Sequence, residues 1–175
     1  MEVNDLITEI AESGREATDD EIRRIREHVA SAGYDPGGMT KAGTSIDGLF
    51  WQGRIIRSND WMDNSVVHFL RHTVAQSEWP QGITLNKYIA SLIQVIEDPA
   101  SGIVIEKRFG QWYLSFVAPA HDTAGADGSG WILVCYSVKY GYWVTGYQPK
   151  FGLDHFNLNP AEGERWLCEL SNLIR

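Results

Sequence analysis

Two histidines four residues apart are the side chains of this sequence best suited to acid–base chemistry. His68 and His72 stand in the run His68-Phe69-Leu70-Arg71-His72, whose neighbours have the apolar spacing of a helix. Residues at positions i and i+4 lie on one helical face. Histidine changes its charge near neutral pH, so it can accept or donate a proton there. The pattern predicts either a catalytic pair or two boundary histidines that hydrogen-bond to the backbone.

Zinc sites use the same i, i+4 histidine spacing, in the motif H-E-x-x-H. Here Phe69 replaces the glutamate, and the further histidines that could complete a ligand set, His121 and His155, are distant in the sequence. We therefore expect chemistry that needs neither a metal nor another cofactor.

A second group of polar side chains lies near the end of the chain, in Trp143-Val144-Thr145-Gly146-Tyr147-Gln148. Residues two apart in a strand face the same side, so Trp143, Thr145 and Tyr147 share a face. Thr145 is a candidate to bond a phosphate oxygen or to orient a histidine. Trp143 and Tyr147 are candidates to contact a substrate. Structural roles for all three remain open, since such residues also favour strands in general.

Lys107 and Arg108 are candidate phosphate clamps. They are adjacent in a predicted strand, so only one of them can face a given layer. A cation that stabilises the charge of a phosphoryl transition state contributes roughly 3–4 kcal/mol in an organised site. The alternative is a solvated charge at the edge of the strand. Arg71 points away from both histidines, and we expect it in solvent or beside a phosphate at the rim.

Helices and then strands are predicted along the chain. Helices are expected at 3–13, 19–32, 65–77, 85–97 and 160–172, with a short strand at 49–57 and a meander of four strands at 103–109, 111–118, 132–138 and 142–148. Thr18 and Thr84 are suited to cap the second and fourth helices. This order predicts an α+β fold: N-terminal helices, a four-stranded antiparallel meander with helices on one face, and a C-terminal helix.

The acidic charge is concentrated at the N-terminus. Residues 1–43 hold ten acids against five bases, whereas the net charge of the whole chain is -8. We interpret 1–43 as an acidic helical appendage and 44–175 as the main domain. Such a field does not attract nucleic acid non-specifically. The two cysteines have no metal-type spacing, and no apolar run reaches membrane-spanning length. We expect a cytoplasmic protein with no membrane partner.

The arrangement of these motifs resembles the barnase–EndoU–colicin–RelE group of bacterial toxin ribonucleases. The likeness lies in the helix of His68 and His72, the following helix through Tyr88, and the aromatic, threonine-containing last strand that ends at Gln148. The resemblance implies RNA cleavage without metal, by attack of a ribose 2′-hydroxyl on the neighbouring phosphorus. It implies helix histidines as acid and base, Lys107 or Arg108 as the basic strand residue, and Thr145 in the last strand.

The first functional hypothesis is therefore a toxin-like endoribonuclease with RNA as its substrate and a possible cognate inhibitor as its partner. The alternative is a non-enzymatic acidic interaction protein, such as an inhibitor, immunity protein or regulatory partner. Its acidic N-terminal segment would cover a basic surface by charge complementarity. A third hypothesis is a small-molecule site in a cleft lined by the many aromatic side chains.

Overall fold

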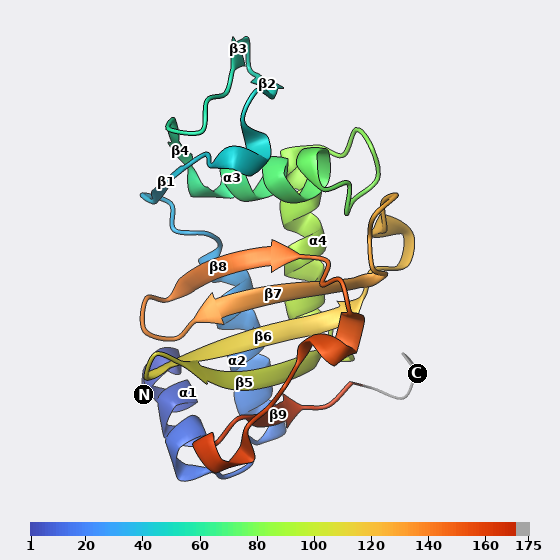
Figure 1. The fold of residues 1–175 in the computed structure, drawn as a ribbon. Coiled ribbons are helices and arrows are strands. Elements are labelled where there is room, and N and C mark those ends of the chain that lie inside the picture. The colour runs from blue at the N-terminus through green and yellow to red at the C-terminus, as the bar shows by residue number, and fades with distance from the viewer. Residues whose placement is uncertain (171–175) are drawn as a thin grey trace.

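Five antiparallel strands form the central sheet of this protein (Figure 1). Their order across the sheet is β8-β7-β6-β5-β9, and every neighbouring pair is antiparallel. The computed structural model describes residues 1–170. The strands are β5 (Gly102–Arg108), β6 (Gln111–Pro119), β7 (Trp131–Ser137), β8 (Tyr142–Tyr147) and β9 (Arg165–Cys168). The fold is α+β, as the order of predicted elements indicates.

The meander from β5 to β8 is confirmed almost to the residue. Phe109 and Gly110 join β5 to β6 with φ angles of 51° and 75°. Two successive positive φ angles are the signature of the tight turn whose twist matches that of the flanking strands. The longer link from β6 to β7 contains the short turn η3 (His121–Thr123).

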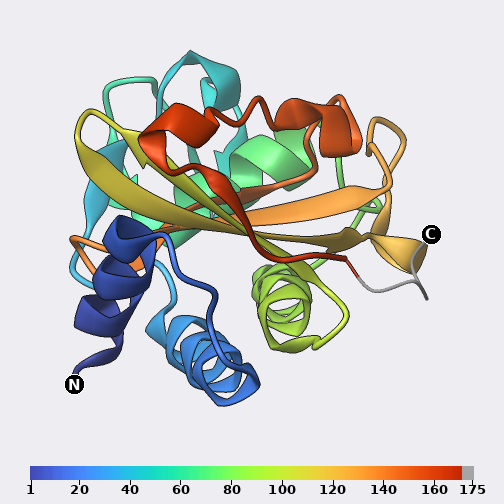
Figure 2. The same cartoon turned by 90° about the horizontal axis from the view of Figure 1, so that it is seen from below.

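Three helices, α1 (Val3–Ser13), α2 (Asp19–Ala32) and α4 (Leu85–Glu97), cover one face of the sheet (Figure 2). Their apolar sides meet the alternate strand residues of that face in one hydrophobic core. This core includes Ile7, Ile10, Ile25, Val29, Leu92, Ile96, Ile105, Leu114, Phe116 and Val134. The segment 1–43, interpreted from sequence as an appendage, thus buries side chains in the same core as the sheet. No helix within residues 1–170 is long and apolar enough to cross a membrane.

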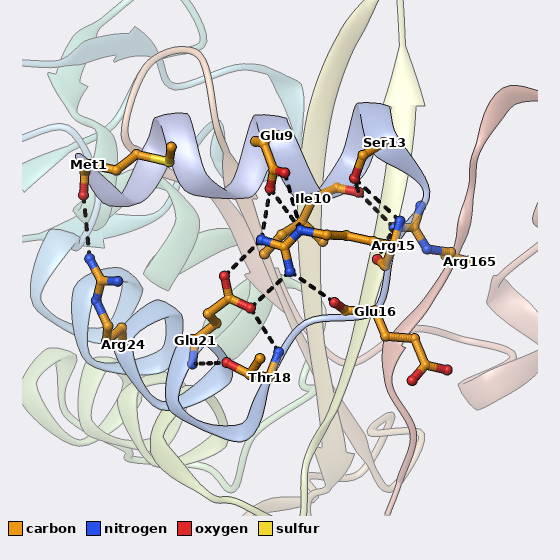
Figure 3. Close-up of polar contacts among 10 residues, drawn as sticks. All are labelled: Met1, Glu9, Ile10, Ser13, Arg15, Glu16, Thr18, Glu21, Arg24 and Arg165. Carbon is orange, nitrogen blue, oxygen red and sulfur yellow. Dashed lines mark hydrogen bonds and ion pairs between the residues drawn. The ribbon is translucent and has the colours of Figure 1, made fainter.

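Ion pairs join the first two helices at the surface (Figure 3). The guanidinium of Arg15 lies 2.8 Å from carboxylate oxygens of both Glu9 and Glu21. The predicted cap is confirmed, because the Glu21 N–H donates to the Thr18 hydroxyl and the Thr18 N–H donates to the Glu21 carboxylate. Arg15 also shows that part of the N-terminal acidic charge is paired within the segment itself.

An excursion between α2 and α3 holds two small antiparallel pairs. Strand β1 (Met39–Lys41) pairs with β4 (Trp61–Asp63), and β2 (Phe50–Trp51) pairs with β3 (Arg54–Ile55). The single strand expected at 49–57 is therefore wrong. Gln52 and Gly53 have φ angles of 47° and 84°, so the chain reverses there into a two-residue hairpin. The turn η1 (Thr44–Ile46) precedes this hairpin.

The predicted histidine helix consists of two parts. The α-helix α3 (Asn64–Phe69) continues into a π-helical turn, η2 (Leu70–Ala75), and the pair lies beyond the β8 edge of the sheet (Figure 1). The cap is Asp63, whose carboxylate accepts the Ser65 N–H. The predicted helix at 85–97 and its Thr84 cap are confirmed.

The helix expected at 160–172 is wrong over the described residues. Pro160–Glu162 form only one short turn, η5, which ends at Gly163 with a positive φ of 83°. After η5 the chain pairs with β5 as strand β9. Another short turn, η4 (Gly152–His155), precedes η5. A short apolar run such as Trp166-Leu167-Cys168 fits a helix or a strand, and here pairing with an open sheet edge decides. Residues 171 and 172 lie outside the described part.

Strand β8 and helix α4 approach each other closely at Gly146. A Cβ at this position would collide with the side chain of Leu92, which is fully buried. The carbonyl of Gly146 also accepts a hydrogen bond from the Tyr88 hydroxyl at 2.5 Å. The missing side chain therefore sets how near the last strand lies to the helix behind it.

We predict that Gly146→Ala destabilises the fold by about 1–3 kcal/mol, because the added methyl overpacks a filled core. Urea unfolding measures the change. Val144→Ala, at an exposed position of the same strand, is the matched control and is expected to cost less. In a Leu92→Ala background the Gly146→Ala change should cost less than it does alone, and equal costs in both backgrounds would contradict this account.

Candidate functional site

The π-helical turn η2 sets the positions of the two histidines. The Gln76 N–H donates to the Arg71 carbonyl five residues earlier, at 3.0 Å. Turns of this kind are rare and occur frequently at functional sites. His68 belongs to the α-helical part and His72 to the π-helical part. Their rings stack with centroids 5.9 Å apart and planes at 18°, so the predicted shared face is confirmed.

Four rings form a stacked column along this part of the molecule. Tyr34 stacks on His68 at 4.9 Å, and Tyr147 stacks on His72 at 5.6 Å. Tyr34 follows helix α2, whereas Tyr147 ends strand β8. The helix histidines and the last strand, which lie far apart in the sequence, therefore meet through His72 and Tyr147. We call Tyr34, His68, His72 and Tyr147 the ring column.

Tyr34 is held in the ring column by both backbone and side-chain contacts. The Trp143 N–H donates to the Gly33 carbonyl at 2.8 Å, which places Tyr34 beside the outer edge of β8. The hydroxyl of Tyr34 lies 2.9 Å from that of Tyr88. Burial, above all, raises the pKa of both phenols, so they stay protonated near neutral pH. Tyr34 thus acts as a fixed apolar cover over His68.

Glu78 is the residue that orients His72. Its Oε2 lies 3.0 Å from Nδ1 of His72, and its Oε1 accepts the N–H of Gln148 at 2.6 Å. The Gln76 side-chain oxygen is also 3.2 Å from Nδ1. Two acceptors at Nδ1 place the hydrogen of the neutral ring there, so Nε2 carries the lone pair. Among the described residues Nε2 has no hydrogen-bond partner, so its lone pair is an unused acceptor.

His68 has a different electrostatic environment from His72. Its pKa is lowered to about 3, first by burial and then by the nearby His72 and Arg71. Its side chain is 9% exposed, and within residues 1–170 its Nδ1 has no hydrogen-bond partner. His68 is therefore neutral at pH 7 and cannot supply a proton there.

Tyr147 connects the ring column to the second face of the sheet, the one that α1, α2 and α4 leave free. Burial raises the pKa of its phenol to about 12. Thr145 lies on the same face, opposite Cys135 of β7. Burial also raises the pKa of the Cys135 thiol to about 11, so this thiol stays protonated. The face beside the ring column thus carries neutral hydroxyl and thiol groups.

The two candidate cations lie on opposite faces of the sheet. Arg108 is on the second face, 3.4 Å from Glu106 and with its guanidinium 5.5 Å from the Tyr113 ring centroid. It is near enough to Cys135 and Tyr147 to influence both of their pKa values. Lys107 points to the helix face, with its Nζ 5.1 Å from the Trp112 ring centroid. Arg108, and not Lys107, is therefore the cation on the face of Thr145 and Tyr147.

Of two further residues expected to bind substrate, Trp143 has another role in this structure, whereas the expectation for Arg71 stays a prediction. Trp143 is fully buried, and its indole N–H donates to the Val29 carbonyl at 2.8 Å. A strand bulge between Trp143 and Thr145 turns it to the helix face, so the three residues expected on one face do not share it. Arg71 donates to the Ser45 hydroxyl at 3.3 Å, which holds it against the excursion.

The sequence did not point to Glu78 or Tyr34, and it named His155 only as a distant histidine for a metal site. Glu78 stands in the loop after the histidine helix, and the one available signal was its place six residues after His72. His155 reaches the site through Tyr147, whose hydroxyl is 3.2 Å from His155 Nε2. Within residues 1–170, no three His, Cys, Asp or Glu side chains are grouped so that they could hold a metal ion.

Comparisons with models of protein families, with curated proteins and with solved structures found no match to this chain.

Replacing Glu78 is predicted to destabilise the protein, because its carboxylate satisfies two buried donors at once. Glu78→Ala should cost roughly 1–3 kcal/mol, and Glu78→Gln, which keeps an acceptor oxygen, should cost less. Chemical denaturation measures both. Glu162→Ala, at an exposed turn position, is the control. Equal stabilities of the Ala variant and the wild type would show that the two contacts contribute nothing.

The lowered pKa of His68 predicts an acid-sensitive fold. Because the native pKa of about 3 lies below the unfolded value near 6.5, the contribution of His68 is complete above about pH 6.5. It is lost as the pH falls toward 3, by at most about 1.4 kcal/mol per pH unit.

His68→Phe keeps the ring stack and removes this titration. The difference in unfolding free energy between wild type and His68→Phe should therefore change between about pH 7 and pH 5, above the range of most carboxylates. A difference that stays constant over that range would argue against a neutral buried His68.

Proposed function

We propose that this protein is an endoribonuclease that uses histidine acid–base catalysis and no metal ion. The observation that carries the proposal is the pair of Glu78 and His72. A buried carboxylate holds one imidazole nitrogen, and the other nitrogen has no hydrogen-bond partner among residues 1–170. A carboxylate that fixes the tautomer and orientation of a histidine is the arrangement by which enzymes prepare a general base.

The proposed reaction begins at Nε2 of His72. This nitrogen takes the proton of a ribose 2′-hydroxyl, and the resulting oxygen attacks the adjacent phosphorus. The bond from phosphorus to the 5′-oxygen then breaks, and that oxygen receives a proton from a general acid. The products are a 2′,3′-cyclic phosphate and a free 5′-hydroxyl. The Glu78 carboxylate stabilises the imidazolium that forms at His72 during the first step.

The second face of the sheet supplies groups for the phosphate. Arg108 and Thr145 lie on that face together with Tyr147, which is in contact with His72. A guanidinium bonds phosphate oxygens through a planar pair of donors, and a threonine hydroxyl adds a neutral donor. The resemblance in layout to toxin ribonucleases, drawn from the sequence, is consistent with the same assignment for the last strand.

Access to the base requires a local movement. His72 is 7% exposed, with Tyr147 stacked on one face of its ring and His68 on the other. Entry of an RNA strand is expected to displace Tyr147 and to leave Glu78 on His72, so the structure corresponds to the closed form of the proposed site.

His72→Ala is predicted to lower RNA cleavage by about 10²–10⁴-fold, the contribution of a general base. Cleavage of a labelled single-stranded RNA, in the presence and absence of EDTA, measures the loss, and end-group analysis identifies the cyclic phosphate. His28→Ala is the matched control, because His28 lies on α2 with its ring edge-on to Tyr136, away from the ring column. A wild type that cleaves no RNA, or a folded His72→Ala variant of undiminished activity, would refute the proposal.

A further inference from the structure

We infer that His155 is the general acid of this reaction, an assignment that rests on the proposed ribonuclease function. Cleavage needs a proton donor for the departing 5′-oxygen as well as a base for the 2′-hydroxyl. His155 is the exposed histidine that contacts the ring column: its Nε2 is 3.2 Å from the Tyr147 hydroxyl, and its ring meets that of Tyr147 edge-on at 6.0 Å.

The other candidate donors in the ring column are unsuitable. His68 stays neutral at pH 7, because burial keeps its pKa near 3. The phenol of Tyr147 has a pKa raised to about 12, so it is a weak acid near neutral pH. His155 is exposed to water, so the imidazolium that the proposed step needs stays hydrated. Among these candidate proton donors, only His155 is both exposed to water and in contact with the ring column.

Tyr147 contacts both the proposed base and the proposed acid. His72 stacks on its ring, and His155 bonds its hydroxyl. The attacking and departing oxygens of an in-line displacement lie on opposite sides of phosphorus. Because one histidine contacts the ring and the other the hydroxyl of the same residue, both are near enough to serve the two oxygens of a phosphodiester that replaces or borders the Tyr147 ring.

The chain around His155 is built to hold it there. His155 ends the turn η4, in which the Asp154 N–H donates to the Phe151 carbonyl at 3.1 Å. The next residue, Phe156, packs against the ring of His155 at 5.3 Å and against Trp166 of β9 at 5.6 Å. This C-terminal segment lies over the face of the sheet opposite α1, α2 and α4 (Figure 2). The chain that follows β8 thus passes back over the second face of the sheet.

The proposed proton transfer is balanced. The His155 imidazolium gives its proton to the 5′-oxygen as the phosphorus–oxygen bond breaks, while His72 retains the proton taken from the 2′-hydroxyl. Exchange with water then returns His155 to its protonated form and His72 to its neutral form. No oxidant, reductant or further reactant takes part.

A substrate with a leaving group that needs no proton tests this role. A nucleoside 3′-(4-nitrophenyl phosphate) releases nitrophenolate, a stable anion, whereas RNA releases an alkoxide. His155→Asn should lower cleavage of RNA by about 10²-fold or more and cleavage of the nitrophenyl ester by about threefold at most. His72→Ala should lower both, because the base acts before the leaving group departs. His121→Asn, at another exposed histidine, should lower neither.

Each other outcome overturns the inference. If His155→Asn cleaves RNA at the wild-type rate, His155 gives no proton to the leaving group. If the substitution lowers the cleavage of RNA and of the nitrophenyl ester equally, His155 binds or positions the substrate and is not the acid. If the wild-type protein cleaves neither substrate, the proposed function fails together with the assignment of His155, and this result differs from the other two because it appears before any substitution is made.

Discussion

The buried carboxylate of Glu78 is the contact on which the arrangement of the candidate site depends. One of its oxygens accepts the Gln148 N–H just beyond β8, and the other accepts from Nδ1 of His72 on η2. A carboxylate buried without donors would lose several kilocalories per mole of hydration, so the two elements must stay within reach of it. The same contact fixes the hydrogen of His72 on Nδ1. Position and chemical state of the candidate base therefore have one cause.

The ring column extends this constraint along the edge of the sheet. Stacking buries the ring faces of His68 and Tyr34, and the Tyr34 hydroxyl keeps a hydrogen-bond partner in that of Tyr88. The cost falls on His68, whose charge is suppressed by the burial. Two histidines that the sequence pattern does not distinguish thus acquire different properties. His72 is bonded to a carboxylate, whereas His68 is kept neutral between two rings.

The two faces of the sheet have separate tasks. The helix face carries the hydrophobic core, including Trp143, whereas the second face carries Glu106, Arg108, Ser115, Thr145 and Tyr147. A bulge in the β7–β8 pairing produces the change of side within the last strand, so that Trp143 is buried while Thr145 and Tyr147 face the other way. The C-terminal segment then brings His155 to this second face.

The sequence by itself determined the α+β class, the helices at 3–13, 19–32 and 85–97, the Thr18 and Thr84 caps, and the β5–β8 meander, because these follow from local periodicity and turn residues. It also determined that His68 and His72 share a face. Only the tertiary structure decided that β9 joins the sheet and that Trp143 belongs to the core. It also decided which face of the sheet Lys107 and Arg108 each take. The contacts of Glu78 with the histidine helix and of His155 with Tyr147 were likewise decided there. Those outcomes depend on contacts between residues far apart in the chain, such as the 70-residue separation of Glu78 and Gln148, and no local pattern encodes which distant partner a polar side chain will find.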